Sequence, residues 1–214
     1  MSLDLINPYV LRILISCRKE DSISAISKRI DLSYGWTYKW VQELAKEGTL
    51  TLTRMNIYLN EYDEFYKKTL NYLLNTFQKS PMFYYEVLNL FGVKYCFTAT
   101  DSVYIWTKGS YNIARYKEYY PVFIKVKSTD RKLFEWYCKK LKLNVNKKSG
   151  IFYSISYLDD FEFEHCDSIP VDSLKSSIKF MEKNIYNFEP ALEIIKELYS
   201  KKIKIKYKEM MTNV

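Results

Sequence analysis

Glycine and proline are scarce in this chain, which has only five of each among 214 residues. Collagen-like chains need glycine at every third position, and disordered linkers are usually rich in glycine, proline and charge. Hydrophobic residues instead make up 48% of the sequence and aromatic residues 17%, including 21 tyrosines. The composition therefore predicts a folded protein with one sizeable core or two modest ones.

Long apolar runs are also missing. No run approaches the roughly 20 residues that a membrane-spanning helix needs. The N-terminal segment carries Asp4 early and shows neither a basic start nor a small-residue cleavage site. We therefore expect a soluble, cytoplasmic protein that does not bind membranes.

Histidine and paired cysteines are rare as well. The four cysteines, Cys17, Cys96, Cys138 and Cys166, are far apart, and His165 is the single histidine. A structural zinc site needs four nitrogen or sulfur ligands at short spacings, so isolated buried thiols are expected instead. A Ser-His-Asp or Cys-His catalytic site would have to use His165 as its base. The sequence also contains no glycine-rich phosphate-binding loop of the kind that binds nucleotides. These absences predict no metal and no cofactor.

The net charge of +8 is unevenly distributed. Residues 1–79 hold 11 basic and 9 acidic side chains, a balance of +2, whereas residues 200–214 hold five lysines and one glutamate, a balance of +4. Half of the excess charge thus lies in a short terminal segment, where a solvated charge run is the simplest interpretation. A nucleic-acid partner has to be argued from the order of elements rather than from total charge.

Three short helices and a hairpin are predicted in the first 61 residues. Pro8 suits the first turn of a helix, because its backbone angle fits there and its missing N–H would have no partner. Ser22 or Ser24 can cap a second helix, and Gly48 can end a third. Apolar and polar residues then alternate around Asn56, as in a small hairpin. The expected elements are helices over 8–20, 22–30 and 34–48, a turn over 31–33, and a hairpin over 49–61.

This order of elements is that of a winged helix-turn-helix. The stretch LSYGWTYKWVQELAKEGTL, residues 32–50, resembles the recognition-helix region of many prokaryotic winged-helix regulators, where a hydrophobic turn, a helix, a Glu-Gly pair and the wing follow one another. The resemblance covers residues 8–60. It implies a DNA-binding domain whose third helix enters the major groove.

The third helix has a predicted inner face of Thr37, Val41 and Leu44, which leaves an outer face for contact with DNA. On that face Lys39 can reach a phosphate or a guanine, and Gln42 can pair with an adenine. Other side chains would bind phosphates and set the register without reading sequence. The candidate DNA-contacting residues are Ser24, Lys28, Arg29, Ser33, Tyr34, Gly35, Trp36, Tyr38, Lys39, Gln42 and Arg54.

Other interpretations of this face stay open. Any solvated helix surface is polar, and a helix-turn-helix can also serve protein interaction alone. Trp36 and Trp40 are expected to pack on the first helix or the wing, with stacking on nucleic acid as the alternative. Salt-dependent binding to duplex DNA would separate a DNA-binding domain from a protein-interaction module.

Residues 61–79 predict a fourth helix with a wide apolar stripe. The stripe covers more surface than one small winged helix can bury, so we expect this helix to pack on a second domain or on another protomer. A dimer is expected for the same reason. The residues of the stripe are Tyr62, Phe65, Tyr66, Leu70, Leu73, Leu74 and Phe77.

From Pro81 onward helices and strands are mixed. The segments KYCFTATDSVYIW, YYPVFIKV, GIFYSISYLDD and IPVDSLKSSIKFMEKNIYNFEPALEIIKEL resemble the C-terminal domain of prokaryotic winged-helix proteins related to the abortive-infection antitoxin (AbiEi-like) family. This resemblance implies a transcriptional regulator that can act as an antitoxin beside a toxin partner. The expected helices cover 82–92, 99–109, 130–143, 171–184 and 189–200, and the expected strands cover 93–98, 121–128, 151–158 and 161–166.

One acidic segment could support an enzyme instead. On a strand, Asp160, Glu162 and Glu164 would point the same way, as metal ligands for a nuclease or nucleotidyltransferase-like reaction must. A nucleotidyltransferase would also need a Gly-Ser followed by a closely spaced Asp-x-Asp, and Gly109-Ser110 has no such pair after it. The simpler interpretation is a solvated edge strand.

The sequence as a whole predicts an α+β protein in which an N-terminal winged helix-turn-helix precedes a mixed α/β domain. The expected boundaries are 1–60 for the DNA-binding domain, 61–79 for a connecting helix, 80–200 for the AbiEi-like domain and 201–214 for a basic tail. The expected function is sequence-specific binding of double-stranded DNA by a non-catalytic regulator, as a homodimer and with a toxin as a further partner. The alternative is a metal-dependent enzyme that uses Asp160, Glu162 and Glu164.

Overall fold

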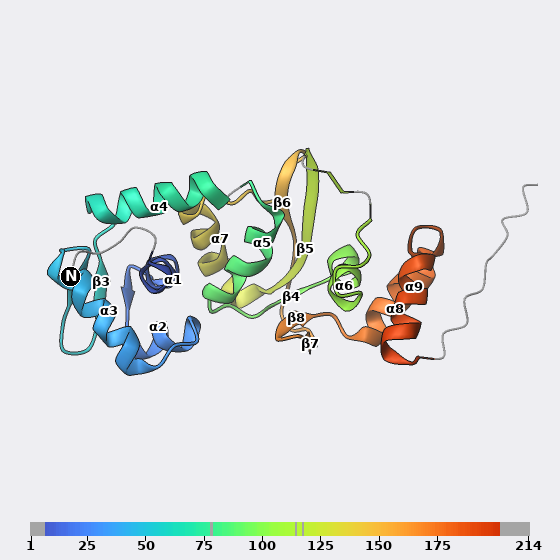
Figure 1. The fold of residues 1–214 in the computed structure, drawn as a ribbon, viewed down its shortest axis with the longest axis horizontal. Coiled ribbons are helices and arrows are strands. Elements are labelled where there is room, and N and C mark those ends of the chain that lie inside the picture. The colour runs from blue at the N-terminus through green and yellow to red at the C-terminus, as the bar shows by residue number, and fades with distance from the viewer. Residues whose placement is uncertain (1–6, 78, 114, 117, 202–214) are drawn as a thin grey trace, which may run out of the picture. The chain divides into compact units, whose positions relative to one another are not determined.

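A computed structural model describes residues 7–77, 79–113, 115–116 and 118–201. It shows a mixed α and β protein with helices around two separate sheets (Figure 1). Within these ranges, none of the helices combines the length and the apolar content that a membrane crossing requires. The predicted basic tail beyond Lys201 lies outside the described residues.

The chain forms two compact units that interleave in sequence. The first unit contains residues 1–93 and 132–144, and the second contains residues 94–131 and 145–214. This division differs from the expected boundaries at residues 60 and 80. Residues 61–93 belong to the first unit because Tyr66 joins the core of residues 10–59 and Leu70 and Leu90 pack against that core. The units interleave because two parallel strands of the second unit need a crossover, and the crossover segment 132–144 belongs to the first unit.

The first unit begins with a helical segment and a small antiparallel sheet of strand order β1-β3-β2. In the register of this sheet, Glu20 lies opposite Tyr58, and Leu50 lies opposite Leu59. The strand β1 was not predicted, since the expected first helix runs to residue 20, whereas α1 ends at Ser16. The elements are α1 (Pro8–Ser16), β1 (Glu20–Asp21), α2 (Ile23–Arg29), α3 (Tyr34–Lys46), β2 (Leu50–Leu52) and β3 (Ile57–Leu59).

Side-chain caps fix the starts of all three N-terminal helices. Asn7 Oδ1 accepts the N–H groups of the first turn of α1, where Pro8 stands as expected. Ser22 Oγ accepts an N–H of α2, and Ser33 Oγ accepts an N–H of α3. Each cap satisfies backbone donors that the helix itself leaves unpaired. Apolar side chains of these elements form one core, which includes Val10, Ile13, Ile26, Ile30, Val41, Leu44, Leu50 and Ile57.

The remaining helices of the first unit are α4 (Glu64–Phe77), α5 (Pro81–Glu86), η1 (Val87–Leu90) and α7 (Arg131–Lys140). The helix α4 does not need another protomer to cover its inner stripe. Tyr66 joins the core of α1–α3, and Leu73 and Leu74 are 4% and 3% exposed within this chain. The sequence left open whether this stripe packs on a second domain or on another protomer, and for Leu73 and Leu74 burial within the chain accounts for the packing. Tyr72 is exposed on the outer side of α4. Phe77 is also exposed in part, although it follows Leu73 by one turn and stacks on Phe83.

The second unit is built on a five-stranded sheet of order β6-β5-β4-β8-β7. The strands β5 and β6 run parallel over their full length, from the pair Tyr119 and Gly150 to the pair Lys127 and Leu158. On β5, Val122, Ile124 and Val126 are fully buried. The elements are β4 (Tyr95–Phe97), α6 (Ala99–Trp106), β5 (Tyr119–Lys127), η2 (Ser128–Asp130), β6 (Gly150–Leu158), β7 (Glu164–Cys166), β8 (Ile169–Val171), α8 (Leu174–Lys183) and α9 (Ile185–Tyr199).

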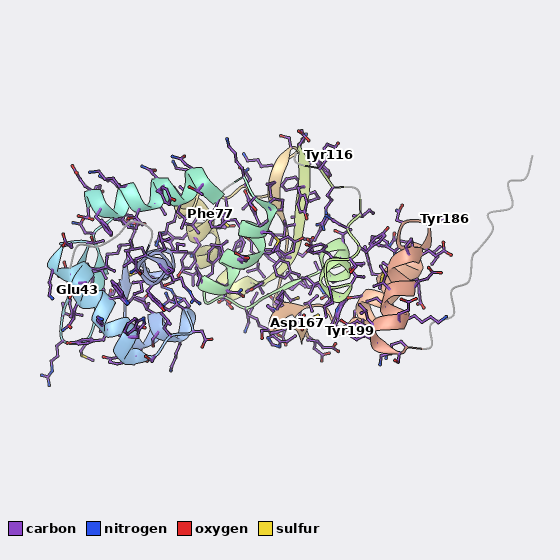
Figure 2. All side chains as sticks on the ribbon, viewed as in Figure 1. Glu43, Phe77, Tyr116, Asp167, Tyr186 and Tyr199 are labelled. Atoms are coloured by element: carbon purple, nitrogen blue, oxygen red, sulfur yellow. The ribbon has the colours of Figure 1, made fainter. Side chains whose placement is uncertain are left out.

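Buried polar contacts join the helices of the second unit to its sheet. Asp101 forms an ion pair with Arg115 at 2.7 Å, and both side chains are almost completely buried. Asp101 also accepts the backbone N–H of Phe123 on β5. Tyr199, labelled in Figure 2, is the last residue of α9. Its hydroxyl donates to the carbonyl of Trp106 at 3.0 Å. These contacts fix α6 on the sheet and α9 on α6.

The acidic segment does not form the strand that was expected over residues 161–166. The strand β7 contains only Glu164–Cys166, and residues 160–163 precede it without regular structure. Asp160 and Glu162 therefore do not share a strand face with Glu164. The short pairing of β7 with β8, which was not predicted, supplies only three opposed residue pairs.

Candidate nucleic-acid interface

The helix α3 has one buried face and one exposed face. Thr37, Val41 and Leu44 are completely buried, as predicted, and Trp40 joins them at 8% exposure. The inner face anchors the helix in the core of the first unit, because these side chains pack with those of α1, α2 and the small sheet. The opposite face is thereby fixed in orientation and open to solvent.

The exposed face carries the predicted combination of aromatic and polar groups. The rings of Tyr34 and Tyr38 stack at a centroid distance of 6.2 Å. Gln42 Nε2 donates to the hydroxyl of Tyr38 at 2.8 Å, so the amide is held along the helix surface. Lys39, on the same helix, is also exposed. The face therefore offers hydrogen-bonding and cationic groups of the kinds that contact base edges and phosphates.

Tryptophans link this face to the first helix. Tyr9 of α1 meets Trp36 edge to face at 5.5 Å and stacks on Trp40 at 6.1 Å. The expected packing of both tryptophans on the first helix is confirmed. Lys39 Nζ lies 4.7 Å from the centre of the Trp36 ring, a cation–π contact that keeps the lysine beside α3.

The N-terminal end of α3 is exposed to solvent. Ser33, whose side chain caps the helix, is exposed. A Cβ added to Gly35 would meet no atom within 4 Å, so the fold itself does not require glycine there. A glycine at this place leaves the helix backbone accessible to a ligand.

Three further predicted contacts lie on the surface of the first unit. Ser24 and Lys28 are exposed on α2. Arg54 lies in the tight connection between β2 and β3, closed by a hydrogen bond from Thr53 N to the carbonyl of Asn56 at 2.9 Å. Its neighbour Met55 is 83% exposed and was not among the predicted residues, since an isolated methionine in a turn carries no sequence signal.

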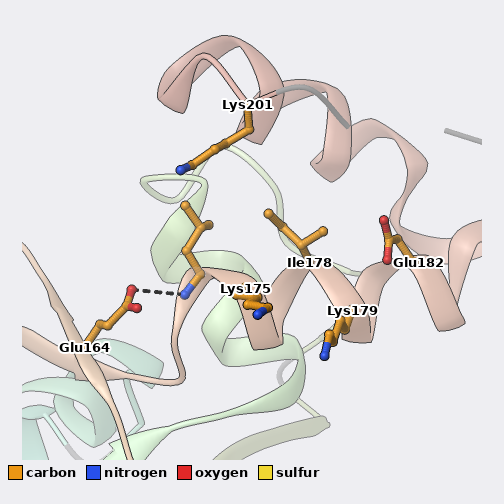
Figure 3. A pocket seen from close by; sticks show the side chains of 7 residues that line it. Glu164, Lys175, Ile178, Lys179, Glu182 and Lys201 are labelled. Atoms are coloured by element: carbon orange, nitrogen blue, oxygen red, sulfur yellow. Dashed lines mark hydrogen bonds between the residues drawn. The ribbon is translucent and has the colours of Figure 1, made fainter. Parts of the chain in front are cut away.

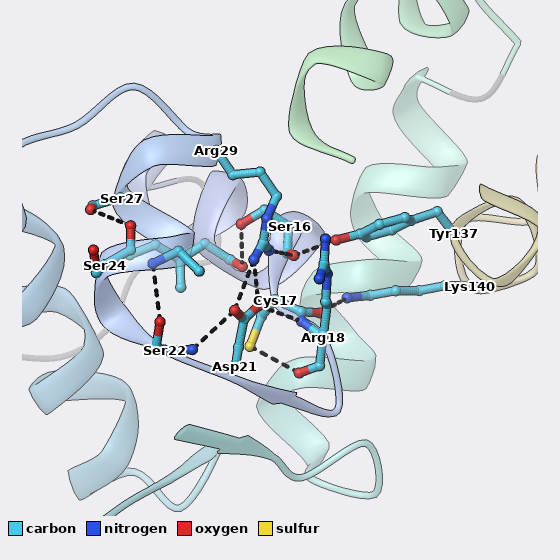
Figure 4. A network of polar contacts seen from close by, with 12 residues as sticks. Ser16, Cys17, Arg18, Asp21, Ser22, Ser24, Ser27, Arg29, Tyr137 and Lys140 are labelled. Carbon is cyan, nitrogen blue, oxygen red and sulfur yellow. Dashed lines mark hydrogen bonds and ion pairs between the residues drawn. The ribbon is translucent and has the colours of Figure 1, made fainter. Parts of the chain in front are cut away.

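Arg29 is a correction to the predicted contact set. Its guanidinium binds both carboxylate oxygens of Asp21, at 2.8 and 2.9 Å, and also donates to the carbonyl of Ser16 (Figure 4). The side chains of Arg29 and Asp21 are only 6% and 3% exposed. A buried arginine that is held by a carboxylate cannot reach a phosphate without breaking this pair. Arg29 therefore stabilises the junction of α1 and α2 instead.

The C-terminal end of α1 is capped by side chains from α7, more than a hundred residues away. Tyr137 donates to the carbonyl of Ser16 at 2.7 Å, and Lys140 Nζ lies 2.7–3.1 Å from the carbonyls of Leu14, Ile15 and Cys17 (Figure 4). The last carbonyls of a helix have no partner within the helix, so these contacts satisfy all four. A cation at this end also complements the helix dipole.

Burial changes the acid–base properties of this cap. The desolvation of Lys140 lowers its pKa from 10.5 to about 8. Burial likewise raises the pKa of the nearby Cys17 thiol to about 12, although Lys140 opposes that change. Cys17 is therefore an unreactive, protonated thiol at neutral pH.

The acidic segment of the second unit forms contacts with the protein itself. Asp160 pairs with Lys94 Nζ at 2.6 Å, which lowers the pKa of its carboxyl group. Glu164 accepts the N–H of Leu174 at the start of α8, at 3.1 Å. Among the described residues, no group of three or more histidine, cysteine, aspartate or glutamate side chains is arranged to hold a metal ion.

A groove of about 510 Å³ lies beside Glu164 in the second unit (Figure 3). Its charged side chains have mixed signs, with three lysines and two glutamates around Ile178 and Leu174. Such a lining does not select one class of ligand. The charged residues are Glu164, Lys175, Lys179, Glu182 and Lys201.

Comparisons with known proteins do not identify a relative. No family model, no curated protein and no solved structure matches the chain. A function for this protein has to be argued from its own residues and their arrangement.

Proposed function

We propose that residues 8–60 form a winged helix-turn-helix that binds double-stranded DNA, with α3 as the recognition helix. The observation that carries the proposal is the order of elements around α3. The helix α2, a short turn and α3 are followed by the β2–β3 hairpin, and β1 pairs with that hairpin to close a small sheet. This arrangement holds α3 by its inner face and presents its outer face to solvent, as docking in a major groove requires.

In this proposal Lys39 and Gln42 reach base edges, because they lie on the exposed face of α3. Lys28, on the neighbouring helix, and Arg54, on the hairpin, bind phosphates on either side of the groove. Gly35 permits close approach of the DNA backbone to the start of α3. Arg29 has no contact with DNA and acts through the stability of the unit.

The proposed biological role is that of a transcriptional regulator that acts as a homodimer. A single small winged helix contacts few base pairs, and two copies pair half-sites about one helical turn apart. The exposed Tyr72 and Phe77 of α4 are candidates for the dimer interface. The resemblance to AbiEi-like proteins extends the proposal to an antitoxin role without catalysis.

Selection of duplexes from a random-sequence pool, followed by binding titrations on the selected site, tests this function. Lys39→Ala and Gln42→Ala should each weaken binding by about 1–3 kcal/mol if the side chains touch bases. Lys183→Ala on α8 is the matched control for loss of one positive charge. Selection of no site, or equal affinity of all four proteins for it, would contradict the proposal.

A second function is favoured by the aromatic groups on α3. Tyr34, Trp36 and Tyr38 are 56%, 39% and 38% exposed, and aromatic side chains are enriched at protein interfaces. The charges of α3 and its C-terminal cap residue also balance, with Lys39 and Lys46 against Glu43 and Glu47. The same face could bind a partner protein such as a toxin. A face of this kind would give no salt-dependent retention on duplex DNA.

A further inference from the structure

A groove of about 380 Å³ lies in the first unit, away from the outer face of α3. Ligand sites of small molecules commonly have volumes of about 300–1,000 Å³. The groove is bounded by the helices α4 and α7 and by the segments that precede β1 and α4. It is lined by Lys19, Glu61, Tyr66, Leu70, Trp136, Lys139 and Lys140.

The floor of the groove is aromatic and apolar. Tyr66 and Leu70 lie one turn apart on α4, and Trp136 faces them from α7. The Trp136 ring is held edge to face against Tyr137 at 4.8 Å, and Tyr137 is fixed in turn by its hydrogen bond to Ser16. A rigid indole beside an aliphatic side chain is a surface on which a planar ring can stack.

The charges around this floor are predominantly positive, with three lysines and one glutamate. Lys139 is exposed, and none of the described residues forms an ion pair with it. Lys19 pairs with Glu61 at 3.4 Å while remaining 70% exposed, so this contact is weak and exchangeable. Lys140 also borders the aromatic floor: its Nζ lies 5.1 Å from the centre of the Trp136 ring and 5.7 Å from the centre of the Tyr66 ring.

We propose that this groove binds a small planar aromatic carboxylate. The ring would stack on Trp136 and Leu70, and the carboxylate would lie between Lys139 and Lys19. A neutral aromatic molecule would leave the cationic rim unused, and a phosphate alone would gain nothing from the aromatic floor. The site is independent of the proposed DNA contacts, since none of its residues belongs to α2, α3 or the hairpin.

Titration calorimetry of the full-length protein with sodium 2-naphthoate, in the absence of DNA, tests this proposal. This anion, with about 13 non-hydrogen atoms, should bind with a dissociation constant of about 1 mM. Lys139→Gln should weaken binding about five-fold, as expected for loss of one exposed ion pair. Lys132→Gln, on the same helix but outside the groove, should bind as the wild type does.

A second pair of measurements separates charge recognition from apolar contact and from misfolding. The neutral analogue 2-naphthamide should bind at least about five-fold more weakly than the naphthoate. Leu70→Ala should weaken both ligands, with circular dichroism confirming that the variant is folded. The absence of saturable naphthoate binding to the wild type, equal affinity for the amide, or an unchanged affinity in Lys139→Gln would each overturn the proposal.

Discussion

The buried pair between Arg29 and Asp21 predicts a large loss of stability when the arginine is removed. In Arg29→Met the carboxylate of Asp21, 3% exposed, loses the ion-pair partner that the described part of the chain gives it. Breaking a buried pair from one side commonly costs about 3–5 kcal/mol, because an uncompensated charge stays in the interior. Asp21 keeps hydrogen bonds from the N–H groups of Arg18 and Ser22 at 3.1 and 3.0 Å. We therefore expect the lower end, about 3 kcal/mol.

Urea denaturation followed by circular dichroism measures this change. The adjacent Lys28→Met is the matched control, since Lys28 is exposed and its replacement should change the free energy of unfolding by less than about 0.5 kcal/mol. Adding Asp21→Asn to Arg29→Met should recover part of the loss, because the double variant no longer buries an unpaired charge. A loss below about 1 kcal/mol in Arg29→Met would refute the assignment of Arg29 to the interior.

Further predictions concern the recognition helix, the fourth helix and the cap of α1. Gly35→Ala should raise the free energy of unfolding by about 0.5–1 kcal/mol, because alanine favours the helix and the added Cβ meets no atom within 4 Å. The same variant should bind DNA more weakly. A gain in stability without loss of affinity would exclude close approach of DNA at this residue. Leu73→Ala should lower the free energy of unfolding by about 2–5 kcal/mol at any protein concentration, whereas a loss that vanishes on dilution would indicate a seam between protomers. Burial lowers the pKa of Lys140 to about 8, so between pH 8 and 10.5 this lysine is protonated in the unfolded chain and largely neutral in the folded protein. The free energy of unfolding of the wild type should therefore rise with pH over this range relative to that of Lys140→Met. A wild-type denaturation midpoint that falls relative to that of Lys140→Met would contradict the lowered pKa.

Local signals predicted most of the elements, because capping and periodicity depend on a few neighbouring residues. Pro8, the Ser22 cap, which was one of two candidates, and the stripe of Thr37, Val41 and Leu44 stand where the pattern placed them. The cap of α3 by Ser33 was not predicted. The outer face of α3 follows from the same periodicity. These features could be predicted because each is decided within one or two helical turns.

Contacts between distant segments could not be predicted in this way. Arg29 looks like an exposed basic residue at the end of a helix, and only the fold brings Asp21 and the carbonyl of Ser16 to it. Lys140 lies in the sequence among solvated lysines, yet it caps a helix near the other end of the chain. The predicted strand over 161–166 was too long because Phe161 and Phe163 alternate with acidic residues, as apolar residues do on a strand. In the structure both phenylalanines lie in an irregular segment, where their rings contact Lys94 Nζ.

The salt dependence of duplex binding is the sharpest test of whether residues 8–60 bind DNA. Fluorescence anisotropy with a labelled duplex, measured over a series of salt concentrations, gives the slope of log affinity against log salt. We expect affinity that falls as the salt concentration rises, and a slope reduced by about one unit in Lys28→Gln but unchanged in Lys183→Gln on α8. Binding that is absent at low salt, or a slope that Lys28→Gln and Lys183→Gln change equally, would contradict it.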